Sequence, residues 1–300
     1  MPGWVPFTGL TAVVLVLLLG LARLSQRAVS DQPALPEPPE STESTPAGEP
    51  TADPEEGVDD PQPAAEQAET GPVTVSGTMD SDGPAAGTAD PIEDVDPSEP
   101  EFSTGALLAN VALTQGLFGA VLAVGAWYYE IPWSALGLTE TAIGSGTLAV
   151  AVGIIFGVLL WTANELSATA ADAVGAGYDE SLREMLAPDS VPGWLLLLGV
   201  ILPIIAVVEE LLFRAALIGV PAAGFGIHPL ALAIFSSALF ALGHGAQGRV
   251  GIVVTGALGF VLAGGYVLTG SLLVVVIAHY LVNALEFVVH EGLGADRGLA

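Results

Sequence analysis

Long apolar segments recur along this sequence, and they limit its fold more strongly than any other feature. A helix crosses a bilayer with about 20 predominantly apolar residues. Seven segments approach that length, so the sequence predicts an all-α fold, a polytopic transmembrane helical bundle of about seven spans. The expected spans are residues 4–22, 104–127, 143–163, 193–219, 229–247, 250–269 and 271–290.

Residues 28–102 differ from the apolar segments on either side of them. They are rich in Pro, Glu, Asp, Ser and Thr, and residues 1–101 hold 20 of the 33 acidic residues of the chain. A segment of this composition buries too little apolar surface to offset the entropy lost on ordering. We therefore expect an N-terminal transmembrane anchor at 1–27, a disordered acidic linker at 28–102 and a membrane domain at 103–300.

The first apolar run also has the length of a signal peptide that is removed by cleavage. Such a peptide carries basic residues before the apolar run and small residues at a cleavage site after it. Here Arg23 and Arg27 follow the run, and no basic residue precedes it. The sequence therefore favours a retained anchor.

The charge and the cysteine content exclude several kinds of function. The chain contains no cysteine, which excludes disulfides, thiolate metal sites and a cysteine nucleophile. Its formal net charge is −27 and it contains no lysine, so no basic patch is available to neutralise the phosphates of a nucleic acid. The same acid-rich, lysine-free composition resembles that of proteins from salt-loving archaea.

The arginines that lie outside the expected spans predict an orientation in the membrane. Basic residues in short loops tend to stay on the cytoplasmic side. With seven spans, one side of the membrane receives all five of these arginines: Arg23, Arg27, Arg183, Arg249 and Arg297. We therefore expect a multi-pass protein of the cell membrane with its N-terminus outside and with the acidic linker and the C-terminus in the cytoplasm.

Three charged residues interrupt the apolar span at 193–219. Glu210 and Arg214 are four residues apart, so they share a helix face and can form an ion pair that lowers the cost of burying both charges. Glu209 points about 100° away from Glu210 on a helix, so that pair need not engage it. A carboxylate left in this position can take a proton from water and pass it on. Such a pair can equally serve structure or a transport pathway.

Later spans also carry polar residues at helical spacing. His244 follows Phe240 by four residues, and Asn283 follows His279 by four. Glu286 and His290 continue the stripe of His279 and Asn283, which we expect to face the interior of the bundle rather than lipid. Each of these residues also has a structural interpretation: His244 as an interfacial histidine near a helix end, and the later stripe as hydrogen bonding between helices.

The order of these motifs resembles one family of membrane proteases. The sequence reads EExxxR at residues 209–214, FxxxH at 240–244 and HxxxN at 279–283, with WSALGL upstream at 133–138. This pattern is similar to that of the CPBP family of CAAX-processing and bacteriocin-processing proteases, also called Abi, type II CAAX prenyl endopeptidase or lysostaphin-resistance-A-like. The resemblance covers roughly residues 130–290, so it implies a CPBP-type intramembrane protease domain within 103–300.

The resemblance implies a role for each matching residue. Glu209 would be the catalytic base, His244 would hold and polarise the attacking water, and His279 and Asn283 would donate hydrogen bonds to the oxyanion. The residues that would support this site are Glu210, Arg214 and Phe240. The implied substrate is a membrane-associated protein or peptide in contact with the lipid bilayer.

Two questions stay open at the level of sequence. No cofactor is favoured, but a metalloprotease-like alternative would bind zinc through Glu209, His244 and His279. The alternatives to a protease are a non-catalytic membrane scaffold or immunity protein and a proton-coupled transporter. The expected span at 229–247 also puts His244 near one membrane surface, whereas Glu209 and His279 lie nearer to the middle of their spans, and a shared site needs all three to meet.

Overall fold

Helices make up all the regular secondary structure in the part of the chain that the structure describes. The computed structural model describes residues 1–30, 104–173, 175 and 181–294, and these residues contain no strand. The predicted all-α fold is therefore confirmed. The predicted acidic linker at 28–102 lies outside the described residues, except for its first three.

The longest helices match the expected spans closely. Within the described residues, six helical segments are long and apolar enough to cross a membrane, whereas α8, with 15 residues, is shorter. The six segments are α1 (Trp4–Ser30), α2 (Thr104–Tyr128), α3 (Thr147–Ala173), the composite segment Val191–Phe225, α9 (Gly248–Thr269) and the segment Leu272–Gly292 formed by α10 (Leu272–Glu286) and η5 (Phe287–Gly292). The expected number of about seven spans is reached when α8 (Pro229–Gly243) is included.

The segment Val191–Phe225 is continuous but widens twice into π-helix. It consists of α5 (Val191–Leu196), the π-helical η2 (Leu197–Ile201), α6 (Leu202–Glu210), the π-helical η3 (Leu211–Gly219) and α7 (Val220–Phe225). Each π-helical stretch ends two residues before a proline, Pro203 or Pro221. A proline lacks the backbone N–H, and its ring clashes with the carbonyl of the preceding turn, so a wider turn relieves the conflict.

The remaining elements are short and lie in the connections. The 3₁₀ turn η1 (Trp133–Leu136) follows α2, the helix α4 (Ser181–Leu186) precedes α5, and the 3₁₀ turn η4 (Gly245–Gln247) joins α8 to α9. The backbone N–H of Leu272 donates to Gly137 O, which ties the start of α10 to the loop after η1.

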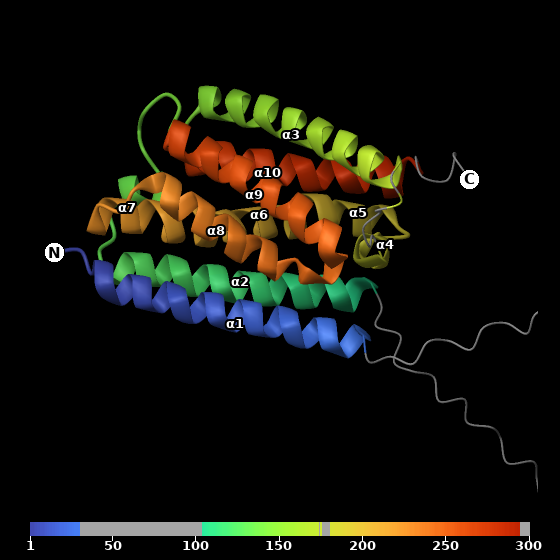
Figure 1. Ribbon diagram of the computed structural model, residues 1–300, viewed down its shortest axis with the longest axis horizontal. Helices are drawn as coiled ribbons and strands as arrows, with labels where there is room; N and C mark the ends of the chain where they lie inside the picture. Colours follow the sequence, from blue (N-terminus) through green and yellow to red (C-terminus); the bar gives the residue numbers. More distant parts are fainter. Residues whose placement is uncertain (31–103, 174, 176–180, 295–300) are drawn as a thin grey trace, which may run out of the picture. The chain divides into compact units, whose positions relative to one another are not determined.

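Small residues allow close helix packing where α3 lies along α10 (Figure 1). A Cβ atom on Gly157 would lie 2.9 Å from Ala278 Cα and 3.0 Å from Ala278 O, and one on Gly153 would lie 2.9 Å from Val274 O. The two backbones are in contact here because glycine has no side chain to separate them. This contact fixes the position of α10, which carries His279.

Helix α1 packs into the same bundle rather than standing apart from it. It lies beside α2 (Figure 1), and Phe7, Val14 and Leu15 are buried in the shared core. The backbone N–H of Gly3 donates to Tyr129 O at 2.7 Å, so the start of α1 is tied to the end of α2. The predicted anchor is therefore also a part of the bundle wall.

Candidate active site

A buried ion pair lies at the centre of the bundle. The side chains of Glu210 and Arg214 are 0% and 1% exposed, and Arg214 Nη1 donates to Glu210 Oε1 at 2.7 Å. Arg214 Nη2 donates to Gly259 O at 3.0 Å, and the guanidinium lies 4.8 Å from the centre of the Phe240 ring. Opposite charge, a carbonyl and an aromatic face compensate for part of the hydration that these groups lose on burial, while Glu210 Oε2 and Arg214 Nε have no hydrogen-bond partner among the described residues.

The close approach of α9 to this pair depends on a glycine. A Cβ atom on Gly259 would lie 2.9 Å from Phe240 Cδ1 and 3.6 Å from Arg214 Nη2. A larger residue would therefore push α9 away from Phe240 and lengthen the hydrogen bond from Arg214 to the Gly259 carbonyl. Because this position has no side chain, the carbonyl comes close enough to accept a hydrogen bond from the arginine.

His279 connects the ion pair to the second glutamate. Its Nδ1 lies 2.7 Å from Glu210 Oε1, and its Nε2 lies 3.7 Å from Glu209 Oε2. A carboxylate bonded to Arg214 accepts rather than donates, so the proton belongs on Nδ1 of His279. Glu210 therefore orients the imidazole, and Nε2 is the nitrogen that faces Glu209.

His244 lies at the C-terminal end of α8. The helix ends at Gly243 instead of continuing to residue 247, and His244 is the residue that follows it. Its Nδ1 donates to Phe240 O at 2.9 Å, and its ring centre lies 4.5 Å from that of Phe240. The ring centre of Phe240 is also 6.1 Å from that of His279, so Phe240 neighbours both imidazoles. His244 therefore lies beside the ring of Phe240 at the end of α8.

The four residues to which the resemblance gives catalytic roles line one cavity. This cavity has a volume of about 330 Å³, and its lining includes Glu209, His244, His279 and Asn283. Aliphatic side chains of α2, η2 and α6 form much of the remaining wall. A second cavity of about 550 Å³, bordered by α1 and α2, shares Glu209, Phe240 and His244 with the first. Glu209 and His244 thus lie where both cavities meet.

Several polar residues of the cavity wall had no signal in the sequence pattern. They are Gln115 of α2, Asn164 of α3, Arg183 of α4, and Gln247 and Thr255, which are joined by a hydrogen bond of 2.7 Å. Gln115, Asn164, Arg183 and Thr255 do not stand at helical spacing from a motif residue, and Gln247, three residues after His244, was not singled out. Only the packing of different helices brings them to the cavity.

The zinc alternative at Glu209, His244 and His279 stays a prediction. A shared ion needs one ligand atom from each of Glu209, His244 and His279 within a few ångströms of the others. In the described part of the chain, the three-residue group whose ligand atoms all lie within 4.8 Å of one another is a different one, Glu165, Glu286 and His290. We therefore derive no catalytic step through a metal at Glu209.

Comparison with known proteins agrees with the motif-based resemblance. A protein-family model described as Type II CAAX prenyl endopeptidase Rce1-like matches residues 191–285. This range contains every predicted site residue and extends from the start of α5 almost to the end of α10. No curated protein and no solved structure matches the chain. The chain is therefore a multi-pass membrane protein, and its residues 191–285 are similar to the type II CAAX prenyl endopeptidase Rce1-like family.

Proposed function

We propose that the protein is an intramembrane endopeptidase that hydrolyses a peptide bond in a membrane-associated protein or peptide. The observation that carries this proposal is the single cavity that Glu209, His244, His279 and Asn283 share. Peptide hydrolysis needs an activated water, donors for the developing negative charge and a proton for the leaving amine. These four side chains can supply all of them without a serine or cysteine nucleophile.

Glu209 is the base in this proposal. The distance of 3.7 Å between Glu209 Oε2 and His279 Nε2 is too long for a direct hydrogen bond. It still allows one water to lie about 2.8 Å from both atoms. Glu209 would remove a proton from that water as its oxygen bonds to the scissile carbonyl carbon, and would then deliver the proton to the leaving nitrogen as the C–N bond breaks.

Asn283 and His279 are the proposed donors to the oxyanion. The amide of Asn283 donates in any protonation state. His279 already uses Nδ1 to donate to Glu210, so its Nε2 can donate only when the ring carries a second proton. A donor aimed at an oxyanion contributes about 3–4 kcal/mol to a transition state of this kind.

The Glu209→Gln variant tests the proposed base. The amide keeps the volume of the side chain but cannot accept a proton from water, so we expect cleavage to fall by at least about 100-fold while the protein stays folded. Termini of membrane peptides would be compared between cells with the parent chain and cells with the variant. Glu140→Gln, at an exposed position in the connection before α3, is the matched control.

The outcome also separates the protease from its alternatives. A scaffold would keep its function in Glu209→Gln, and the processed termini would be the same in both cells. A transporter would lose proton-coupled transport in the variant without any change in processed termini. Either result would contradict the proposed peptidase activity.

We further propose that Glu209 activates water without a bound metal. This version is supported by the group of possible metal ligands whose atoms lie within 4.8 Å of one another in the described residues, because that group does not include Glu209. The purified parent chain and the Glu209→Gln and His279→Ala variants should then contain equal amounts of zinc, measured by elemental analysis. Loss of one equivalent of zinc in both variants would instead support the metalloprotease-like version.

A further inference from the structure

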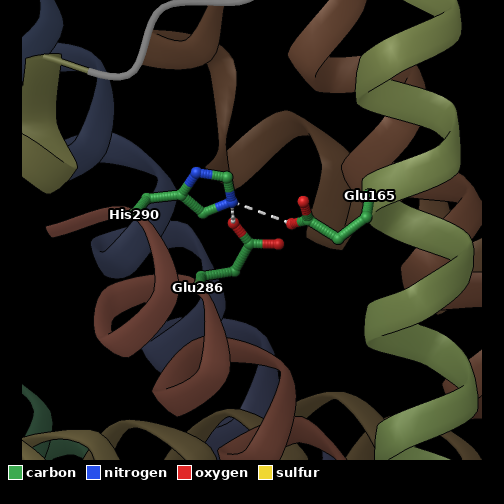
Figure 2. Close-up of side chains that lie close together, drawn as sticks. All are labelled: Glu165, Glu286 and His290. Atoms are coloured by element: carbon green, nitrogen blue, oxygen red, sulfur yellow. Dashed lines mark hydrogen bonds and ion pairs between the residues drawn. The ribbon is translucent and has the colours of Figure 1, made fainter. Parts of the chain in front are cut away.

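A second cluster of ionisable residues joins α3 to the end of α10. Glu165 comes from α3, Glu286 from the last residue of α10 and His290 from η5 (Figure 2). His290 Nε2 lies 2.9 Å from Glu165 Oε1 and 3.6 Å from Glu286 Oε2. One imidazole nitrogen thus faces a carboxylate from each of two helices.

These separations agree with those of a first coordination sphere. Zinc binds imidazole nitrogen and carboxylate oxygen at about 2.0–2.2 Å, which puts neighbouring ligand atoms of a tetrahedral site about 3.3 Å apart. The two measured distances fall on either side of that value, and the ligand atoms of the three residues all lie within 4.8 Å of one another. Small side-chain rotations would bring all three to one ion.

The surroundings hold Glu286 in the orientation that a ligand needs. Asn164 Nδ2 donates to Glu286 Oε1 at 2.6 Å, which leaves Oε2 as the oxygen that faces His290. Hydrogen bonds of this kind commonly orient the carboxylates that bind a metal. Arg183 approaches Glu286 Oε2 at 3.4 Å and Glu291 at 3.0 Å, so it is the cation with which a metal would compete.

Carboxylates outnumber guanidinium groups among the described residues of this cluster. Three carboxylates, Glu165, Glu286 and Glu291, lie around one guanidinium, that of Arg183. Their side chains are only 13–28% exposed. Carboxylates gathered inside a protein in this way are costly unless cations compensate them. A divalent cation would supply such compensation and would take the place of any proton on His290 Nε2.

We propose that Glu165, Glu286 and His290 bind a divalent transition-metal ion of the zinc type, which links α3 to the end of α10. One imidazole and two carboxylates suit zinc, with water in the fourth position. All three residues lie outside the matched range 191–285, although Glu286 lines the same cavity as Glu209. The ion would stabilise the wall of the cavity, and its binding does not depend on peptidase activity.

Zinc binding to the purified full-length chain tests this site. The protein, prepared in detergent with a histidine-free affinity tag, would be treated with a chelator and then titrated with zinc. We expect one bound zinc per chain and a rise in Tm when zinc is added. Glu165→Gln, Glu286→Gln and His290→Gln should each lose both the bound zinc and the rise in Tm.

Matched variants identify where the ion binds. His228→Gln, at an exposed histidine before α8, controls for the loss of an imidazole, and Glu209→Gln controls for the loss of a carboxylate in the cavity. Both should bind zinc as the parent chain does. Zinc that persists in His290→Gln but is lost in Glu209→Gln would overturn the proposal and move the ion to the other site. A parent chain that binds no zinc would overturn it as well, because the cluster would then be an ion-pair network around a protonated His290.

Discussion

At the scale of the residue, three side chains explain why this membrane bundle tolerates charge. Glu210 accepts hydrogen bonds from both Arg214 and His279. The spacing of four residues predicts the first of these bonds, because both partners lie on one helix. The second joins residues 69 positions apart, and no local pattern indicates it. The meeting of Glu209 with His279 likewise followed only from the family resemblance.

Removal of the guanidinium should destabilise the fold itself. In Arg214→Gln, Glu210 would keep its charge but lose its cationic partner inside the protein. Breaking a buried pair in this way costs about 3–5 kcal/mol. We expect a clear loss of thermal stability of the purified protein, followed by intrinsic fluorescence or by the onset of aggregation.

Two matched variants define the cause of that loss. Arg249→Gln removes an exposed arginine and should leave Tm unchanged. Arg214→Lys keeps the charge but offers no planar fork for Glu210 and the Gly259 carbonyl, so its Tm should lie between those of the parent and Arg214→Gln. Equal stability of Arg214→Gln and the parent would show that Glu210 does not need this partner.

At the scale of the element, hydropathy predicts where apolar helices lie but not where they end inside the bundle. The apolar run at 229–247 was expected to be one span, yet the helix ends at Gly243. The sequence GHGAQG that follows contains the glycines that allow the chain to turn, with Gly248 at a φ of +75°. Hydropathy averaged over a window cannot locate such a turn, so it did not predict that His244 directly follows the last residue of α8.

The contact of α3 with α10 should be sensitive to a single methyl group. In Gly157→Ala the new Cβ would meet the backbone of Ala278, which cannot move aside as a flexible side chain could. We expect a loss of about 1–3 kcal/mol in stability. Cleavage should fall too, because Ala278 precedes His279. Both changes can be measured as the Tm and the cleavage rate of the purified variant.

The same substitution in α2 provides the control. A Cβ atom on Gly116 would meet no atom within 4 Å. Gly116→Ala should therefore keep the parent stability or raise it by up to about 1 kcal/mol, since alanine favours a helix more than glycine does. If both variants behave alike, the close contact of α3 with α10 does not govern the stability of this bundle.

At the scale of the whole molecule, the lengths of the apolar runs were sufficient to predict an all-helical membrane bundle. They could not predict the cavities, which arise where the side chains of several helices fail to fill the space between them. They also could not predict that α1 packs against α2 and borders the second cavity. A single run carries information about its own burial but little about its neighbours.

The distribution of arginines leads to a final prediction about the orientation of the whole chain. Because the chain contains no cysteine, single cysteines can report on each side of the membrane. Glu140 and Asp189 are both exposed in connections, with α3 between them. In intact cells, a membrane-impermeant thiol reagent should label Glu140→Cys but not Asp189→Cys, and inverted vesicles should show the reverse. Labelling of Asp189→Cys from outside would mean that basic residues do not fix the orientation of this protein, and that the acidic linker faces the exterior.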